Sequence, residues 1–176
     1  VQAGHDNTAW SSDSVTTSMT NRAGVLVRNA ERSEVIKAAL MAGADRVTHD
    51  TTSADLLNYR RSATDQTANG LDRRYGAGQL NARNSYWILA AGEQGSTEDG
   101  NAAANVASRG FDYDPYFGGS SGSNTTATYP LPVDTVPRLL TAALVWNLDI
   151  NGGTASSFNP AATLRDLNLE VLDLSE

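Results

Sequence analysis

The chain has 176 residues, which is enough for one ordinary domain or two smaller units. Its 13 Lys+Arg against 20 Asp+Glu give a formal net charge of −7, and this acidic balance argues against a nucleic-acid partner, which would require clustered cations. The absence of cysteine excludes disulfides, thiolate zinc sites and cysteine nucleophiles, and no apolar run approaches the roughly 18 residues of a membrane span.

Residues 1–30 are polar and rich in Ser, Thr and Asn, with Trp10 and the run Val25-Leu26-Val27 as their main apolar anchors. We expect a surface loop with one short strand at Gly24–Arg28. The first residues resemble neither the basic nor the apolar part of a signal peptide, and Val1 is not a methionine. We therefore expect a fragment or a processed product.

The segment Ser33–Gly43 carries the clearest helical pattern in the chain. Ser33 is suited to cap the helix, Glu34 suits the positive end of its dipole, and Gly43 predicts a left-handed residue that ends it. The spacing of the apolar residues predicts one buried stripe, formed by Val35, Ile36, Ala39 and Leu40.

A tight turn is predicted at Tyr75-Gly76-Ala77-Gly78, after a polar insertion at 45–69. Gly76 and Gly78 permit a positive φ or a close approach to another backbone. A dinucleotide-binding loop would need a third glycine and a preceding strand, so we interpret Tyr75, Gly76 and Gly78 as a structural turn. Asn81 then predicts an N-cap, followed by a short helix with a buried stripe of Tyr86, Trp87, Ala90 and Ala91.

Residues 92–108 contain little apolar area and are typical of a linker. From Arg109 onward Pro, Gly, Thr and aromatic residues dominate, and short alternating runs favour an antiparallel β-sandwich. A turn is expected at Asn151-Gly152-Gly153. The strands are expected at Gly110–Tyr113, Thr126–Val133, Leu139–Asn147 and Leu164–Leu174.

One oxygen-rich segment is a weak candidate for a calcium site. Asn147, Asp149 and Asn151, followed by Gly152, imitate the start of an EF-hand loop, but Phe158 stands where the bidentate carboxylate belongs. A hairpin turn is the favoured interpretation, and a structural Ca²⁺ site is the alternative.

The two histidines lack a spaced set of partners. Asp45 and His49 are four residues apart, but they follow the glycine that ends the helix, and Asp6 lies beside His5. We expect both imidazoles to be solvated rather than catalytic or bound to metal.

Four segments resemble one protease family. The sequence Tyr-Gly-Ala-Gly-Gln-Leu-Asn-Ala at 75–82 resembles the turn that introduces the last helix of the catalytic domain in subtilisin-like serine proteases, and Val35–Gly43 resembles the helix that follows their nucleophile helix. The segments Ala142–Asn147 and Leu164–Val171 resemble strands of the jelly-roll domain fused behind certain secreted members, with Arg165 and Asn168 as departures from that pattern.

The resemblance implies an α+β fragment: the C-terminal helices of an α/β subtilisin-like domain at 1–95, a linker at 96–108 and an incomplete jelly-roll-like sandwich at 109–176. It implies a secreted or cell-surface serine endopeptidase whose nucleophile lies upstream of Val1. The partners would be the remainder of the catalytic domain and, through it, a polypeptide substrate. Thr17-Ser18-Met19 imitates the nucleophile motif, but Thr16 replaces its glycine, so Ser18 is not expected to be the nucleophile.

Two rival functions remain open. One is a non-enzymatic adhesion or carbohydrate-binding module that uses an aromatic face, although aromatic residues at this spacing are more often core and rim. The other is a degenerate protease relative kept as a scaffold. Asn124-Thr125-Thr126 also fits a glycosylation acceptor. The aromatic candidates are Tyr113, Tyr116, Phe117 and Tyr129.

Overall fold

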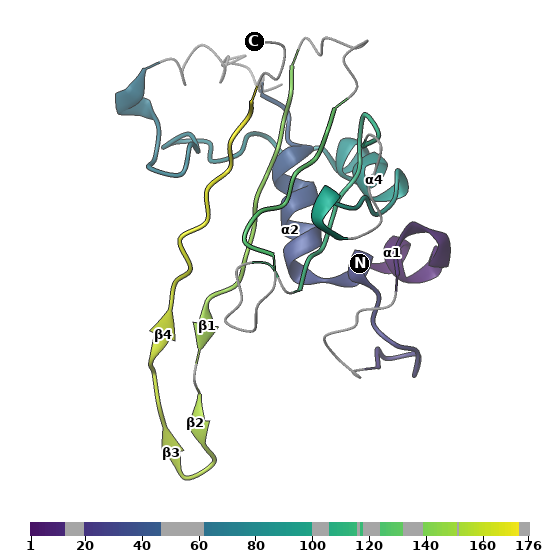
Figure 1. The fold of residues 1–176 in the computed structure, drawn as a ribbon, viewed down its shortest axis with the longest axis vertical. Coiled ribbons are helices and arrows are strands. Elements are labelled where there is room, and N and C mark those ends of the chain that lie inside the picture. The colour runs from purple at the N-terminus through teal and green to yellow at the C-terminus, as the bar shows by residue number, and fades with distance from the viewer. Residues whose placement is uncertain are drawn as a thin grey trace.

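The chain is a mixed α+β structure in which short helices pack together and a β arm extends away from them (Figure 1). The fold comes from a computed structural model, which describes residues 1–12, 20–46, 62–99, 106–115, 117, 124–131, 139–150 and 152–172. The α-helices are α1 (Gln2–Asp6), α2 (Ser33–Ala42) and α4 (Ala82–Ala90). The 3-10 helices are η1 (Thr8–Trp10), η2 (Asn29–Glu31), η3 (Ala63–Asp65) and η4 (Thr97–Asp99).

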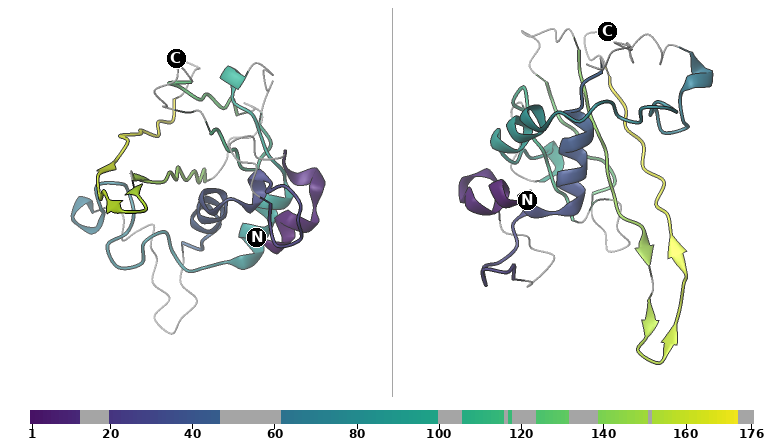
Figure 2. Two further views of the ribbon diagram at one scale, coloured as in Figure 1. Left: turned by 90° about the horizontal axis from the view of Figure 1, so that it is seen from below. Right: turned by 180° about the vertical axis from the view of Figure 1, so that it is seen from behind.

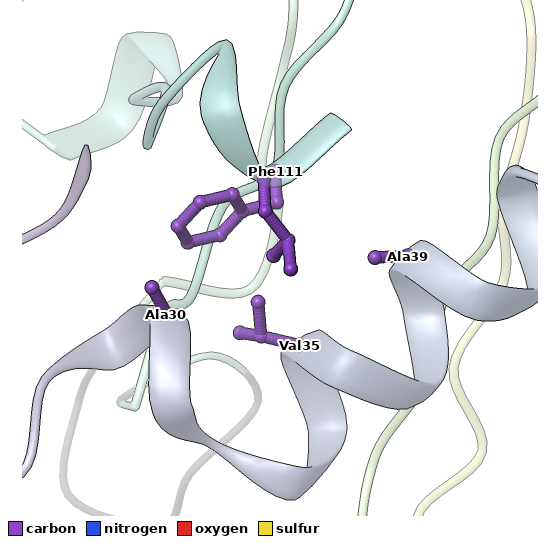
Figure 3. Close-up of a cluster of buried hydrophobic side chains, with 5 residues drawn as sticks. Ala30, Val35, Ala39 and Phe111 are labelled. Carbon is purple, nitrogen blue, oxygen red and sulfur yellow. The ribbon is translucent and has the colours of Figure 1, made fainter. Parts of the chain in front are cut away.

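The hydrophobic core is small and lies between α2, η2, α4 and the segment after the expected linker (Figure 3). Phe111 lies opposite the helices, so a residue from the C-terminal half completes the core of the N-terminal half. Half-buried Trp10, Ile36, Ile88 and Tyr113 pack around it. The buried members are Ala30, Val35, Ala39, Leu89 and Phe111.

Helix α2 confirms the predicted helix, with Val35 and Ala39 of the predicted stripe buried, but Leu40 of that stripe is 39% exposed. Two further details differ. Arg32 is the N-cap and Ser33 is the first helical residue. Gly43 has a φ of −80°, so it is not the left-handed residue we predicted. It is needed for space, because a Cβ there would lie 2.8 Å from the backbone nitrogen of Ser85 in α4.

Helix α4 begins as predicted, because the side chain of Asn81 accepts a hydrogen bond of 3.0 Å from the backbone N–H of Asn84. The predicted buried stripe is wrong. Ser85 and Leu89 are buried, whereas Tyr86 is 44% and Trp87 is 46% exposed. The small residues Gly43 and Ser85 let the two helices approach closely, so the face that carries Ser85 turns toward α2.

The expected strand at Gly24–Arg28 is only an isolated bridge between Thr20 and Leu26. The chain turns tightly instead, and the side-chain oxygen of Asn21 accepts the backbone N–H of Ala23 at 2.9 Å. This side-chain contact competes with strand pairing, as Asn side chains commonly do in turns.

Part of the expected linker is packed rather than open. Glu93 forms a parallel bridge with Phe111, and Ser96 is only 1% exposed. Val106 is also buried, and its N–H donates to the carbonyl of Pro130. Low apolar content did not prevent order here, because backbone hydrogen bonds to neighbouring segments hold the chain in place.

The β arm consists of two antiparallel two-stranded sheets, and the further views in Figure 2 also show it standing away from the helices. Strand β1 (Asp149–Ile150) pairs with β4 (Ala162–Thr163), and β2 (Gly153–Thr154) pairs with β3 (Ser157–Phe158). The connection between β3 and β4 is one residue longer than that between β1 and β2 and contains Pro160, which cannot donate to a ladder.

The arm differs from the expected sandwich. Its turn lies at residues 155–156, between the paired Thr154 and Ser157, and not at Gly152-Gly153. Where the structure describes the four expected strand regions, they form no ladder of their own, and Phe111 takes part in an isolated bridge with Glu93. The described residues therefore show an antiparallel hairpin and no sandwich.

Candidate functional site: a glycine turn and a histidine–glutamate pair

The two glycines of the predicted turn have different roles. Both have positive φ, +58° at Gly76 and +129° at Gly78, as the sequence predicted. A Cβ on Gly76 would meet nothing within 4 Å. A Cβ on Gly78 would lie 2.3 Å from the carbonyl oxygen of Asp45. Gly76 is therefore needed for its backbone conformation, and Gly78 for both its conformation and the close approach of a second backbone.

The second backbone belongs to the segment that follows α2. The N–H of Asp45 donates to the carbonyl of Gln79 at 2.8 Å, and the N–H of Gln79 donates to the carbonyl of Asp45 at 3.0 Å. The side chain of Asn81 donates to both carboxylate oxygens of Asp45, at 3.0 and 2.9 Å. The turn therefore links the N-cap of α4 to the segment just after α2.

Within the turn, Asp72 organises the backbone. It is 3% exposed, and its Oδ1 accepts the N–H groups of Arg74 and Tyr75, both at 2.7 Å. Its backbone also exchanges hydrogen bonds with Gly76. Tyr75 is 37% exposed. These contacts are those of a structural turn, because the N–H groups that would face a phosphate are directed to Asp72 instead.

The structure brings His5, Asn21 and Glu31 together, a cluster that sequence reasoning missed. The Nδ1 atom of His5 lies 3.2 Å from Oε1 of Glu31 and 2.6 Å from Nδ2 of Asn21. The His5 side chain is 24% exposed and that of Glu31 only 6%. The other Glu31 oxygen, Oε2, accepts the N–H of Arg28 at 2.8 Å. His5 is thus engaged with a buried carboxylate and is not simply solvated.

A carboxylate beside an imidazole orients the ring and stabilises its protonated form. In a hydrolase such a pair serves a nucleophile that lies within hydrogen-bond reach of the other ring nitrogen. Among the described residues, the polar contacts of the His5 ring are with Asn21 and Glu31, and no serine or threonine hydroxyl is among them. The pair is therefore an imidazole–carboxylate contact without a nucleophile in the described part of the chain.

A second polar junction centres on Glu93. Its Oε2 accepts both the N–H and the hydroxyl of Ser12 at 2.8 Å, and its Oε1 accepts the side-chain amide of Asn29 at 2.6 Å. Its own N–H donates to the carbonyl of Trp10. These bonds join the segment after α4 to residues 10–12 and η2, so Glu93 has a structural role.

Only part of the calcium candidate lies within the described residues. The side-chain amide of Asn147 donates to Oε1 of Glu34, Asp149 begins β1, and Asn151 lies outside the described residues. In the part of the chain that the structure describes, no three or more His, Cys, Asp or Glu residues form a group suited to a metal ion. The calcium site stays a prediction.

Some of the other candidate residues lie within the described part of the chain and some lie outside it. Ser18, His49 and Tyr116 lie outside the described residues. The Arg32 guanidinium stands over the ring of Tyr113, 5.1 Å from its centroid. Tyr129 is 40% exposed and donates its hydroxyl to Asp112 at 2.6 Å.

A shallow hollow of about 340 Å³ lies beside the C-terminal end of α4. Trp87 forms one side and the exposed Arg109 another. No charged residue of this lining is buried, so nothing there fixes the chemistry of a ligand. The remaining lining residues are Ala90, Ala91, Ala107 and Ser108.

No family model, curated protein or solved structure matches this chain. Among the described residues, even α2, with its 10 residues, is much shorter than the roughly 20 residues that a helix needs to cross a bilayer.

Proposed function

We propose that this chain is the non-catalytic C-terminal portion of a secreted subtilisin-like serine endopeptidase. The catalytic triad belongs to residues upstream of Val1, and the parent enzyme hydrolyses peptide bonds by acyl transfer to its serine. The chain supports that reaction by completing the fold of the catalytic domain. It contributes no member of the triad.

The observation that carries the proposal is the way the two family-like motifs fit together. The helix motif ends at Gly43, which is placed against Ser85 of α4, and the Tyr-Gly-Ala-Gly turn contacts Asp45 just after α2. Both motifs are thus used to pack one helix on the other, and neither presents a reactive group. This supports a role as the closing segment of a catalytic domain.

The surface of the chain supports the same partner. A two-stranded hairpin with an exposed apolar surface is marginal in water by itself. Further protein, here the rest of the parent, would cover that surface. The exposed apolar residues on the arm and its continuation are Leu148, Ile150, Phe158, Leu164, Leu169, Val171 and Leu172.

A fluorophosphonate probe, which reacts with activated serines, tests the proposal on both the chain and its parent. We expect no labelling of residues 1–176 alone. We expect labelling of the parent at a serine upstream of Val1, in a Gly-Thr-Ser-x-Ala context, and the same labelling in a Ser18→Ala parent. Labelling at Ser18, or a parent that neither reacts with the probe nor hydrolyses peptides, contradicts the proposal.

The 40% exposure of Tyr129 favours a second candidate, a non-enzymatic carbohydrate-binding or adhesion module. Its hydroxyl is bonded to Asp112, so a ligand would contact the exposed part of the side chain. Binding on a glycan array that is lost in Tyr129→Ala, with no serine labelling in the parent, would establish this function in place of the first.

A further inference from the structure

The Nδ1 atom of His5 stands between two groups that need opposite protonation states. Nδ2 of Asn21, at 2.6 Å, is a donor and needs an unprotonated Nδ1 that accepts. Oε1 of Glu31, at 3.2 Å, is an acceptor and needs a protonated Nδ1 that donates. One nitrogen atom satisfies only one of these neighbours at a time.

The orientation of the Asn21 amide is fixed by its other contacts. Its Oδ1 accepts the backbone N–H groups of Ala23 at 2.9 Å and Val25 at 3.3 Å. Flipping the amide would place NH₂ against these two donors, so Nδ2 is the atom that faces His5. The competition at Nδ1 therefore cannot be removed by exchanging the amide nitrogen and oxygen.

We propose that His5 is a proton-operated link that ties α1 to the turn at residues 21–25 when the imidazole is neutral and to Glu31 in η2 when it is protonated. The link does not depend on the proposed peptidase origin. In the neutral state the proton resides on Nε2 and Nδ1 accepts from Asn21. Protonation of Nδ1 directs the ring to the buried carboxylate. The Asn21 amide then keeps Glu31 Oε1, at 3.3 Å, as its remaining acceptor, and the turn loosens from α1.

The charged surroundings of His5 come from several elements. Asp6 is its neighbour on α1, where it accepts the side chain of Gln2. Glu31 lies on η2, and the guanidinium of Arg28 is directed to the carbonyls of Thr8 and Ser11. Two other elements pack against α1. Helix α4 carries the titratable residues Arg83 and Tyr86, and η1 carries none. The turn itself contains Arg22. The buried Glu31 carboxylate is thus the acceptor placed to receive the imidazole proton.

NMR titration of the His5 ring between pH 8 and 5 tests the link. Asn21→Ala removes the partner of the neutral form, so the titration midpoint should rise. Glu31→Gln removes the charge that favours the protonated form, so the midpoint should fall. Long-range ¹⁵N–¹H correlations should show an unprotonated Nδ1 at pH 8.

The turn provides the second readout. The amide shift of Ala23 should titrate with the same midpoint as His5 and should lose this response in His5→Phe. His49→Gln, a change at the other histidine, should leave the response intact. Both variants must first show native circular dichroism. The proposal is overturned if the His5 midpoint then moves in the same direction in Asn21→Ala and Glu31→Gln, or if it does not move in either. An Ala23 amide that ignores the His5 titration also overturns it.

Discussion

Replacing Gly78 by alanine would place a methyl group where the carbonyl of Asp45 lies. The added Cβ would be 2.3 Å from that oxygen and 3.1 Å from its carbon, well inside contact distance. Because the obstacle is backbone, relief requires that the Asp45 and Gln79 segments separate. Their two hydrogen bonds, of 2.8 and 3.0 Å, would then be lost.

The structure gives the magnitude. A residue with a Cβ in a left-handed conformation costs roughly 1–2 kcal/mol. Two net backbone hydrogen bonds add roughly 1–3 kcal/mol, so Gly78→Ala should lower the free energy of unfolding by about 2–5 kcal/mol. Gly76→Ala and Gly70→Ala are matched controls, since both positions have positive φ and open space around the Cβ position. Each control should lower the free energy of unfolding only by the conformational cost of a Cβ at positive φ.

Thermal and urea unfolding of the three variants measure the difference. For a chain of this size, 1 kcal/mol corresponds to roughly 2–4 °C, so Gly78→Ala should melt about 2–12 °C below the two controls. Amide exchange at Gln79 should also accelerate in Gly78→Ala alone. Equal melting temperatures in the three variants would refute the argument that close approach, and not φ alone, requires glycine at position 78.

Two further predictions concern single side chains. Asn81→Ala removes the N-cap of α4 and the amide that holds Asp45, so it should destabilise the protein by about 1–2 kcal/mol in urea unfolding. The control Leu80→Ala changes an exposed side chain and should have little effect. Equal losses of stability in the two variants would contradict the capping role. The hydroxyl of Thr128 and, to a smaller extent, its backbone N–H donate hydrogen bonds to Glu98, and these bonds lower the pKa of Glu98 from 4.5 to about 2. Since this pKa is depressed on folding, the stabilisation is present above about pH 4.5 and is lost as the pH falls toward 2. The stability difference between the native protein and Glu98→Gln should therefore shrink across that window, and a difference that does not vary with pH would be evidence against it.

The local elements that were predicted correctly are those decided by neighbouring residues. The helix at Ser33–Ala42, the Asn81 cap and the positive φ at Gly76 and Gly78 depend on side chains and backbone within a few residues. Helical periodicity, capping chemistry and the steric freedom of glycine act over that range. The absence of a membrane span in the described helices follows from composition in the same way.

The errors arose where a residue's environment comes from distant parts of the chain. Hydrophobicity favoured Tyr86 and Trp87 for the buried face of α4, but the contact between Gly43 and Ser85 decided which face meets α2. Gly43 itself was expected to end a helix by its conformation, and it is needed instead for space. The paired segments of the β arm also differ from the expected strands, since register depends on which segments meet.

The sequence by itself determined the helices α2 and α4, the glycine turn between them and the mixed α+β class. Only the tertiary structure decided that Gly78 admits the backbone of Asp45 and that His5 meets Asn21 and Glu31. Those partners lie 16 to 33 residues apart along the chain, beyond the reach of any local pattern. Their meeting depends on how α1, η2 and α4 pack, which is a property of the whole fold and not of any one segment.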